Sequence, residues 1–277
     1  MLIDAHQHFW RIDAPDVVWP TQDLAAIHRD FGPADLAAVG GPVELSGSVL
    51  VQSQPNDQDT DWLLEVAAAQ PSVLAVVGWA DLLAPDAPAR IGQLARAPKL
   101  KGLRPMLQSL ADGAWIADRA LDPAIDAMVA HGLSLDALVL TRHLPALRQL
   151  ALRRPDLAIV IDHGAKPSIV TSEISPWARA IDDLAALPQV CCKLSGLLTE
   201  TGPDQPWDAL KPYVAHLVEA FGPRRLMWGS DWPVLNLASD YGAWLVLARE
   251  FSGLTRDADL AALFGETARR FYRIGGA

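Results

Sequence analysis

Two histidines near the start of the chain are the first residues whose type and spacing suggest chemistry. His6 and His8 are separated by one residue and follow the predicted strand 2–5. Side chains alternate between the two faces of a β-strand, so residues two apart point to the same side. Two imidazoles that converge at the end of a strand form half of a divalent-metal site. A histidine pair held by hydrogen bonds alone is the alternative.

Two more residues of metal-ligand type also follow predicted strands. His163 comes after the run 157–162, and Asp231 comes after the run 226–230. An aspartate that ends an apolar strand is a poor candidate for burial without a partner, although it could instead cap the next helix. Imidazole and carboxylate groups are both zinc ligands. His6, His8, His163 and Asp231 are therefore our candidate centre, and one divalent ion, with zinc first, is its candidate cofactor.

Other polar and aromatic residues near predicted strand ends are candidates for substrate binding. Arg104 offers a forked guanidinium to a carboxylate or to hydroxyl oxygens, or else forms a buried ion pair. Lys193 either binds substrate hydroxyls or pairs with a neighbouring acid. Tryptophans in loops could cover the apolar face of a sugar ring. The full set of candidates is Trp10, Gln52, Arg104, His143, Lys193 and Trp232, of which His143 could equally cap a helix.

Eight short runs rich in β-branched residues must position these side chains. They are the segments 2–5, 47–52, 73–79, 100–104, 134–140, 157–162, 190–195 and 226–230. Longer stretches between them carry apolar residues at helical spacing. This alternation predicts parallel β–α–β units, and eight units in one chain predict a (β/α)8 TIM barrel, regular or distorted. An open doubly wound sheet is the alternative, but no GxGxxG sequence follows the first strand.

The barrel prediction places two long irregular stretches, 9–28 and 108–120, over the mouth of the barrel, because they follow the first and fourth strands. We find no linker, low-complexity tract or internal repeat. One domain spanning residues 1–277 is the simplest interpretation.

The composition limits the classes of function. Of 277 residues, 51% are apolar and 20% charged, and the formal net charge is −10 without any basic run, which argues against binding to nucleic acid. No apolar stretch approaches the about 20 residues that cross a bilayer. The adjacent Cys191 and Cys192 should point to opposite faces of a strand and stay unpaired. Together with the lack of a signal peptide, this favours the cytoplasm. The sequence gives no indication of oligomeric state.

Four motifs together resemble the amidohydrolase superfamily. They are HQH at 6–8, DHGAKP at 162–167, KLSG at 193–196 and GSDWP at 229–233. The similarity runs from residue 2 to about residue 273. It is closest to the lactonase branch, which includes L-fuconolactonases, L-rhamnonolactonases and 2-pyrone-4,6-dicarboxylate lactonases. The first motif and the final aspartate are typical of the superfamily, whereas the other stretches point to the branch.

The resemblance implies a hydrolase that opens a small sugar-acid lactone. This substrate is the only partner that we expect for the protein. It places His6, His8, His163 and Asp231 at active-site positions. Many members of the superfamily have a metal-bridging lysine or glutamate on strand four and a histidine after strand five. Here Arg104 ends strand four, which argues against a two-metal site. Either one metal or none remains, because members of this branch differ on that point.

Lactone hydrolysis assigns a role to each residue of the centre. We expect Asp231 to take a proton from water and to pass it to the ring oxygen. His6 and His8, with or without a metal, would polarise the carbonyl, and His163 would complete the ligand set or bind the oxyanion. Two alternatives remain. One is metal-dependent decarboxylation of an aromatic or enol acid on the same fold, and the other is a barrel that binds a ligand without catalysis.

Overall fold

The computed structural model contains one parallel sheet that curves into a barrel. The structure describes residues 1–275, and in this range eight strands follow one another in the order β1 to β8, each paired in parallel with the next. They are β1 (Leu2–Gln7), β2 (Leu45–Val51), β3 (Val73–Gly78), β4 (Leu100–Leu103), β5 (Ser134–Ala137), β6 (Ile159–Ile161), β7 (Val190–Leu194) and β8 (Leu226–Trp228). The predicted (β/α)8 architecture is therefore confirmed.

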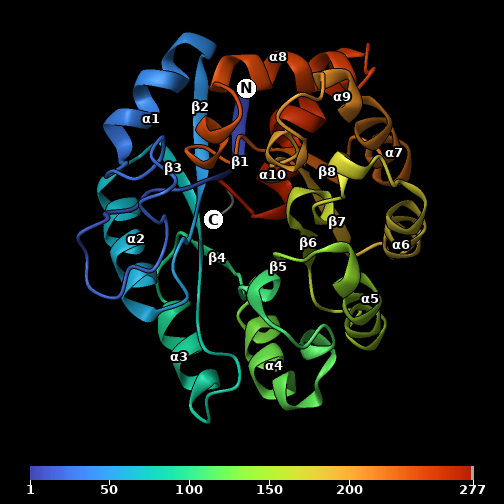
Figure 1. Cartoon of the computed structure of the whole chain (residues 1–277). Helices are drawn as coiled ribbons and strands as arrows, with labels where there is room; N and C mark the ends of the chain where they lie inside the picture. The colour runs from blue at the N-terminus through green and yellow to red at the C-terminus, as the bar shows by residue number, and fades with distance from the viewer. Residues whose placement is uncertain (276–277) are drawn as a thin grey trace.

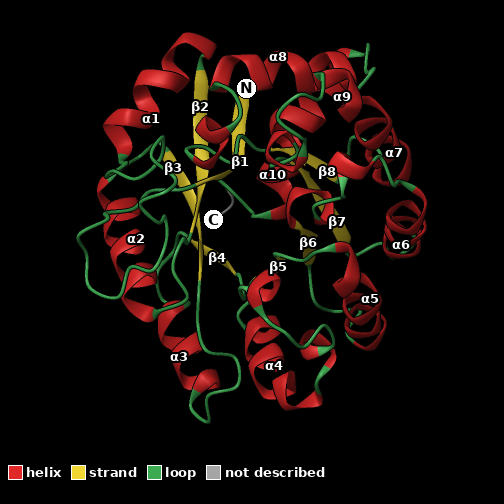
Figure 2. Ribbon diagram, in the orientation of Figure 1, coloured by secondary structure: helices red, strands yellow, loops and turns green. Residues whose placement is uncertain are grey.

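Helices surround the strands. Figures 1 and 2 show α1 to α8 as an outer ring with the strands at the centre. The α-helices in the described part of the chain are α1 (Pro33–Gly40), α2 (Asp57–Ala69), α3 (Ala87–Leu94), α4 (Asp122–Ala130), α5 (Leu144–Arg153), α6 (Ser175–Ala185), α7 (Lys211–Phe221), α8 (Tyr241–Phe251), α9 (Asp257–Ala261) and α10 (Thr267–Phe271). No described helix is both long enough and apolar enough to span a membrane.

The barrel closes at residues of the candidate centre. The backbone N–H of Asp231 donates to the carbonyl of His6 at 2.8 Å, and the N–H of His8 donates to the carbonyl of Trp232, also at 2.8 Å. These bonds accompany an isolated parallel bridge between Gln7 and Trp232, just after β8. Closure of the sheet therefore fixes the backbones that carry the candidate residues relative to one another.

Apolar side chains fill both the interior of the barrel and the layer between strands and helices. One buried cluster joins Ile3, Val49, Val160 and Met227, from strands on different sides of the barrel, to Tyr272 at the end of α10. A larger cluster joins the outer faces of the strands to the helices. Because the strands are covered on both faces, their sequences read as nearly continuous apolar runs.

A bulge in β1 turns the first histidine toward the centre. Asp4 pairs with Ser48, but Gln7 pairs with Leu50, so β1 has one extra residue between these pairs. Residues 3 and 5 face the interior cluster, and strict alternation would send residue 7, not His6, in the same direction. A bulge re-aims side chains in this way. Our expectation that regular alternation orients the HQH motif is therefore corrected.

The other predicted elements differ from the observed ones mainly at their ends. The predicted strand 134–140 ends at Ala137, and Leu138 and Val139 are buried without belonging to it. Their apolar character thus reflects burial rather than strand pairing. The stretch 9–28 contains turns, and the stretch 108–120 contains turns and short 3-10 segments; neither contains an α-helix or a named strand. Cys191 faces the interior cluster and Cys192 the outer one, and both are free.

Candidate active site

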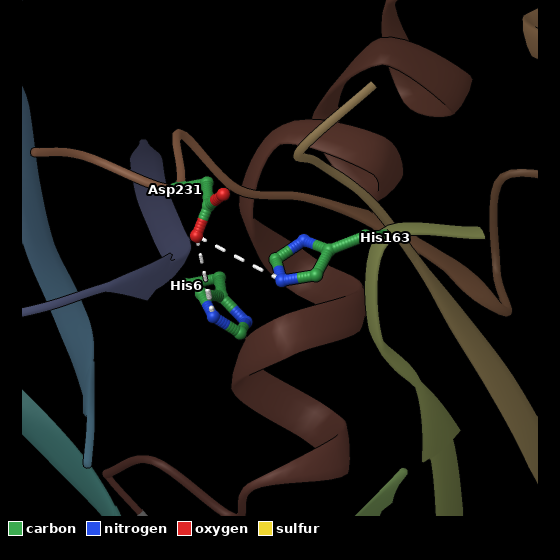
Figure 3. A group of neighbouring side chains, drawn as sticks. All are labelled: His6, His163 and Asp231. Atoms are coloured by element: carbon green, nitrogen blue, oxygen red, sulfur yellow. Dashed lines mark ion pairs between the residues drawn. The ribbon is translucent and has the colours of Figure 1, made fainter. Parts of the chain in front are cut away.

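Three imidazole rings surround Asp231 at the carboxyl ends of the strands. Its Oδ1 atom lies 3.3 Å from Nε2 of His8 and 3.6 Å from Nε2 of His6. The same oxygen lies 3.8 Å from Nε2 of His163. All four side chains are buried. Figure 3 shows His6 and His163 turned toward the carboxylate. The structure thus brings together the four residues that the sequence analysis selects for the centre.

Asp4 anchors the segment that carries Asp231. Its carboxylate accepts hydrogen bonds from the Ser230 N–H at 2.8 Å, from the Ser230 hydroxyl at 2.6 Å and from the Tyr241 hydroxyl at 2.9 Å. Asp231 itself has a φ of 60°, in the left-handed region. Burial raises the pKa of Asp4 to about 6 despite these bonds. The sequence analysis does not select Asp4, although its place two residues before His6 is a signal for it.

The loop after β7 holds His163. The hydroxyl of Ser195 lies 2.9 Å from Nδ1 of His163, so the other ring nitrogen is free to face Asp231. Gly196 has a φ of 61°, and a Cβ atom at this position would lie only 2.5 Å from Nδ1 of His163. A glycine is therefore needed here for two reasons, its backbone conformation and the close approach of the ring.

Lys193 lies beneath the centre and is fully buried. Its Nζ atom is 2.7 Å from Oδ2 of Asp136, 2.9 Å from Oδ1 of Asp162 and 3.1 Å from Nδ1 of His6. The hydroxyl of Tyr272 donates to the same oxygen of Asp136 at 2.5 Å. Of the two alternatives for Lys193, the structure shows pairing with acids. The sequence signal for Asp136 is a lone acid within an apolar strand, which requires a partner when buried.

Burial and neighbouring charges set the ionisation of the centre. Burial, and next the Lys193 ammonium, hold the pKa of His6 well below its ordinary value, and burial lowers the pKa of His163 to about 4. Burial alone would raise the pKa of Asp231, but His163, His8 and His6 together hold it below its ordinary value. At neutral pH the centre therefore offers neutral rings at His6 and His163 beside an ionised carboxylate.

This donor set fits one divalent ion. His6, His163 and Asp231 offer ligand atoms that all lie within 4.8 Å of one another. Tetrahedral zinc, with bonds of about 2.0–2.1 Å, places its ligand atoms about 3.3 Å apart. The separations of 3.6 and 3.8 Å between Asp231 Oδ1 and the two Nε2 atoms are close to this value. Neutral imidazole and ionised carboxylate are the forms that bind metals. His8 lies beside this three-residue group.

A cavity of about 270 Å³ opens above the centre. His8, His163 and Asp231 line it, together with Arg104 and Lys166. Its apolar wall consists of Val18, Trp19, Pro55, Met106, Leu138 and Val234. The irregular stretches 9–28 and 108–120 both contribute lining residues, as expected for loops that follow strands one and four.

Two cationic side chains line the cavity, and each has an acidic neighbour. Nη1 of Arg104 is 3.6 Å from Oδ2 of Asp162, and Nη2 donates to the carbonyl of Gln52. Nζ of Lys166 is 3.5 Å from Oε1 of Glu200. Lys166 is not among the predicted site residues, although it belongs to the DHGAKP motif.

The structure places the other five predicted substrate-binding residues outside the lining of the cavity. They are Trp10, Gln52, His143, Lys193 and Trp232. Trp10 and Trp232 pack edge-on against Phe31, which buries both rings. Gln52 donates to the Arg104 carbonyl, and Nδ1 of His143 accepts the Leu140 N–H at 2.9 Å, which is the helix-cap alternative. Trp19 lies at the cavity wall instead.

Comparison with known proteins assigns the chain to a family. A model of the amidohydrolase family matches residues 3–274. An L-fucono-1,5-lactonase of Burkholderia ambifaria is 52% identical over 276 residues, covering 98% of this chain and 95% of the relative. An L-fucono-1,5-lactonase of Burkholderia multivorans is 35% identical over 284 residues, covering 98% and 96%. The crystal structure of an amidohydrolase from Burkholderia multivorans with bound zinc superposes with a TM-score of 0.93 at 36% identity over 99% of both chains. The chain therefore belongs to the amidohydrolase family.

Proposed function

We propose that this protein hydrolyses a small sugar-acid lactone to the open-chain acid. The observation that carries this proposal is the carboxyl group of Asp231, which three imidazoles surround and which lines a cavity of about 270 Å³. Two relatives named L-fucono-1,5-lactonase match almost the whole chain. A barrel that only binds a ligand has no need for a carboxylate base among imidazoles.

The chemistry follows from these positions. Asp231 takes a proton from water, the resulting hydroxide bonds to the lactone carbonyl carbon, and the bond from that carbon to the ring oxygen then breaks. Asp231 returns the proton to the alkoxide that leaves. The Arg104 guanidinium at the cavity is the donor that we assign to the developing oxyanion. When held by His6, His163 and Asp231, a divalent ion supplies Lewis-acid polarisation.

The charges at the cavity favour a neutral lactone over a carboxylated acid. Decarboxylation of an aromatic acid would need a cation aimed at the leaving carboxylate. Arg104 and Lys166 are the cationic lining residues among those that the structure describes, and Asp162 and Glu200 lie 3.6 and 3.5 Å from them. The apolar wall around Trp19 would contact ring carbons of the sugar. We therefore place sugar lactones ahead of the decarboxylase alternative.

Turnover of a lactone panel tests this function. Neutral aldonolactones, lactones that carry a carboxylate, and aromatic carboxylic acids are offered to metal-stripped and zinc-supplemented enzyme, and acid release or decarboxylation is followed. We expect hydrolysis of at least one neutral aldonolactone, and the ratio of the two preparations gives the contribution of the ion. If no lactone is hydrolysed and an aromatic acid is decarboxylated, the decarboxylase alternative would replace the lactonase proposal.

The cytoplasm is the compartment that we infer for this activity. Both cysteines are free, and free thiols suit a reducing compartment. The lactone is the only partner that the site requires. The formal net charge of −10 disfavours binding to the negatively charged phosphates of a nucleic acid.

A further inference from the structure

The cavity has a polar group that takes no part in the hydrolysis steps, the ion pair of Lys166 and Glu200. We propose that Lys166 binds a ring hydroxyl of the lactone, and that Glu200 restricts the site to neutral, hydroxylated substrates by cancelling the charge of this lysine. The inference rests on the proposed function, because it names the substrate class of the same cavity. It adds one substrate-binding residue and one positioning residue to the site.

The first support is that the ammonium group of Lys166 has donors to spare. Such a group has three N–H donors and no acceptor. Among the residues that the structure describes, Oε1 of Glu200 is the one acid that contacts its Nζ atom, at 3.5 Å. Ammonium and carboxylate groups normally approach to about 2.7–2.9 Å, as Lys193 and Asp136 do at 2.7 Å. Lys166 therefore lines the cavity with N–H groups that a ligand can engage.

The second support is the backbone that carries this lysine. The φ angles of His163, Gly164, Ala165 and Lys166 are 55°, 56°, 63° and 47°. The left-handed region disfavours side chains, and three of these four residues carry one. A turn of this kind is the mirror image of a helical turn, so residues three apart lie on the same side. His163 and Lys166 accordingly both line the cavity.

Contacts behind the turn fix its conformation. Nε1 of Trp177 donates to the Gly164 carbonyl at 2.6 Å, and a Cβ atom at Gly164 would lie 3.0 Å from the side chain of Leu217. Ala165 is fully buried. Strained backbone that its surroundings fix in this way clusters at ligand-binding sites. A partly exposed ion pair contributes little to stability, so stability alone does not account for a costly turn that ends in Lys166.

The neighbouring charges decide which substituent Lys166 binds. An isolated ammonium group would also attract a carboxylate or a phosphate. Glu200 cancels the charge of Lys166, and Asp162 lies 3.6 Å from Arg104, the other cationic lining residue in the described part of the chain. The cavity therefore offers an anion no net positive charge. A hydroxyl group needs none, because it accepts a hydrogen bond from the ammonium while remaining neutral.

The Lys166→Met variant tests the hydroxyl contact. It keeps an unbranched side chain and removes the three donors. On the neutral aldonolactone that the wild type turns over fastest, we expect KM to rise about tenfold and kcat to stay within about threefold, since a ring hydroxyl away from the reacting bond is bound equally in the ground state and the transition state. Lys211→Met, which breaks the exposed pair with Asp208, is the matched control and should behave as the wild type.

Thermal unfolding establishes that both lysine variants are folded. An unchanged KM in Lys166→Met would show that this lysine does not contact the substrate, and it would overturn the proposal. A fall in kcat as large as the rise in KM would overturn it as well, because Lys166 would then act on the reacting ester. Turnover by the wild type tests the proposed function, and the ratio of variant to wild type tests this inference, so the two failures are distinguishable.

The Glu200→Gln variant tests the second half of the proposal. Glutamine keeps the shape of the side chain and an acceptor beside Lys166 but leaves the charge of the lysine uncancelled. The probe is D-glucaro-1,4-lactone, which carries a carboxylate, used as an inhibitor of hydrolysis of the neutral lactone. We expect it to inhibit Glu200→Gln at an about fivefold lower concentration than it inhibits the Asp208→Asn control. Equal inhibition of the two variants, or none in either, would show that Glu200 does not set the preference for neutral substrates.

Discussion

Asp231 is ionised because three rings surround it, although burial alone would favour its neutral form. Asp231→Asn keeps the shape of the side chain but removes its capacity to take a proton. We expect kcat for an aldonolactone to fall by about 10²- to 10⁴-fold, the usual contribution of a general base. The measurement is acid release at saturating substrate. Asp208→Asn, at an exposed carboxylate on the surface, is the control, and a loss of under tenfold in Asp231→Asn would exclude Asp231 as the base.

Residue types at strand ends predict which side chains converge, because histidine and aspartate are costly to bury without a partner. His6, His8, His163 and Asp231 converge as expected. The roles of the residues that surround the centre are harder to predict. Whether a lysine on a strand faces a substrate or two buried acids depends on which strands lie beside it, and the position of Asp136 opposite Lys193 is a property of the closed barrel.

Among the structural elements, some are predicted from the sequence and others are not. Apolar runs predict the eight strands, because burial on both faces leaves a strong compositional signal. The bulge in β1 leaves no such signal, yet it decides that His6 faces inward. The loop after β1 illustrates the other limit. Trp10 and Trp19 belong to one irregular segment, and only the path of the chain back to Phe31 determines that Trp19 lines the cavity while Trp10 is buried.

The loop after β7 supplies a prediction at the level of elements. Gly196 and Gly253 both have positive φ values, 61° and 64°, but only a Cβ at Gly196 would strike the His163 ring. Alanine at either position should cost about 1–2 kcal/mol of stability, since a left-handed backbone disfavours a side chain. We expect only Gly196→Ala to lose kcat, by at least tenfold. Urea unfolding and lactone hydrolysis measure the two effects, and equal activity in both variants would contradict the role of this loop in holding His163.

At the scale of the whole molecule, the segment at the end of α10 reaches the interior of the barrel. α10 lies against β1 and β8 (Figure 1), and Tyr272, which follows it, packs among interior residues of several strands. Its hydroxyl bonds Asp136, which in turn binds Lys193 and so reaches His6. The residue that follows α10 and the first strand are thus joined through polar groups below the centre. Such a network stabilises the barrel only while every member has its partner.

The Tyr272→Phe variant tests whether this polar network stabilises the fold. The hydroxyl of Tyr272 bonds a buried carboxylate at 2.5 Å, and loss of a hydrogen bond to a charged group costs about 1.5–3 kcal/mol. Tyr213→Phe is a matched control, because the Tyr213 hydroxyl is also buried but has no hydrogen-bond partner among the described residues. We expect Tyr272→Phe to lower the free energy of unfolding in urea by that amount and Tyr213→Phe to leave it nearly unchanged. Because Lys193 keeps both of its acids in Tyr272→Phe, kcat should stay within about threefold of wild type, roughly 0.6 kcal/mol in barrier height. A large loss of activity without a loss of stability would instead place Tyr272 in the catalytic chemistry.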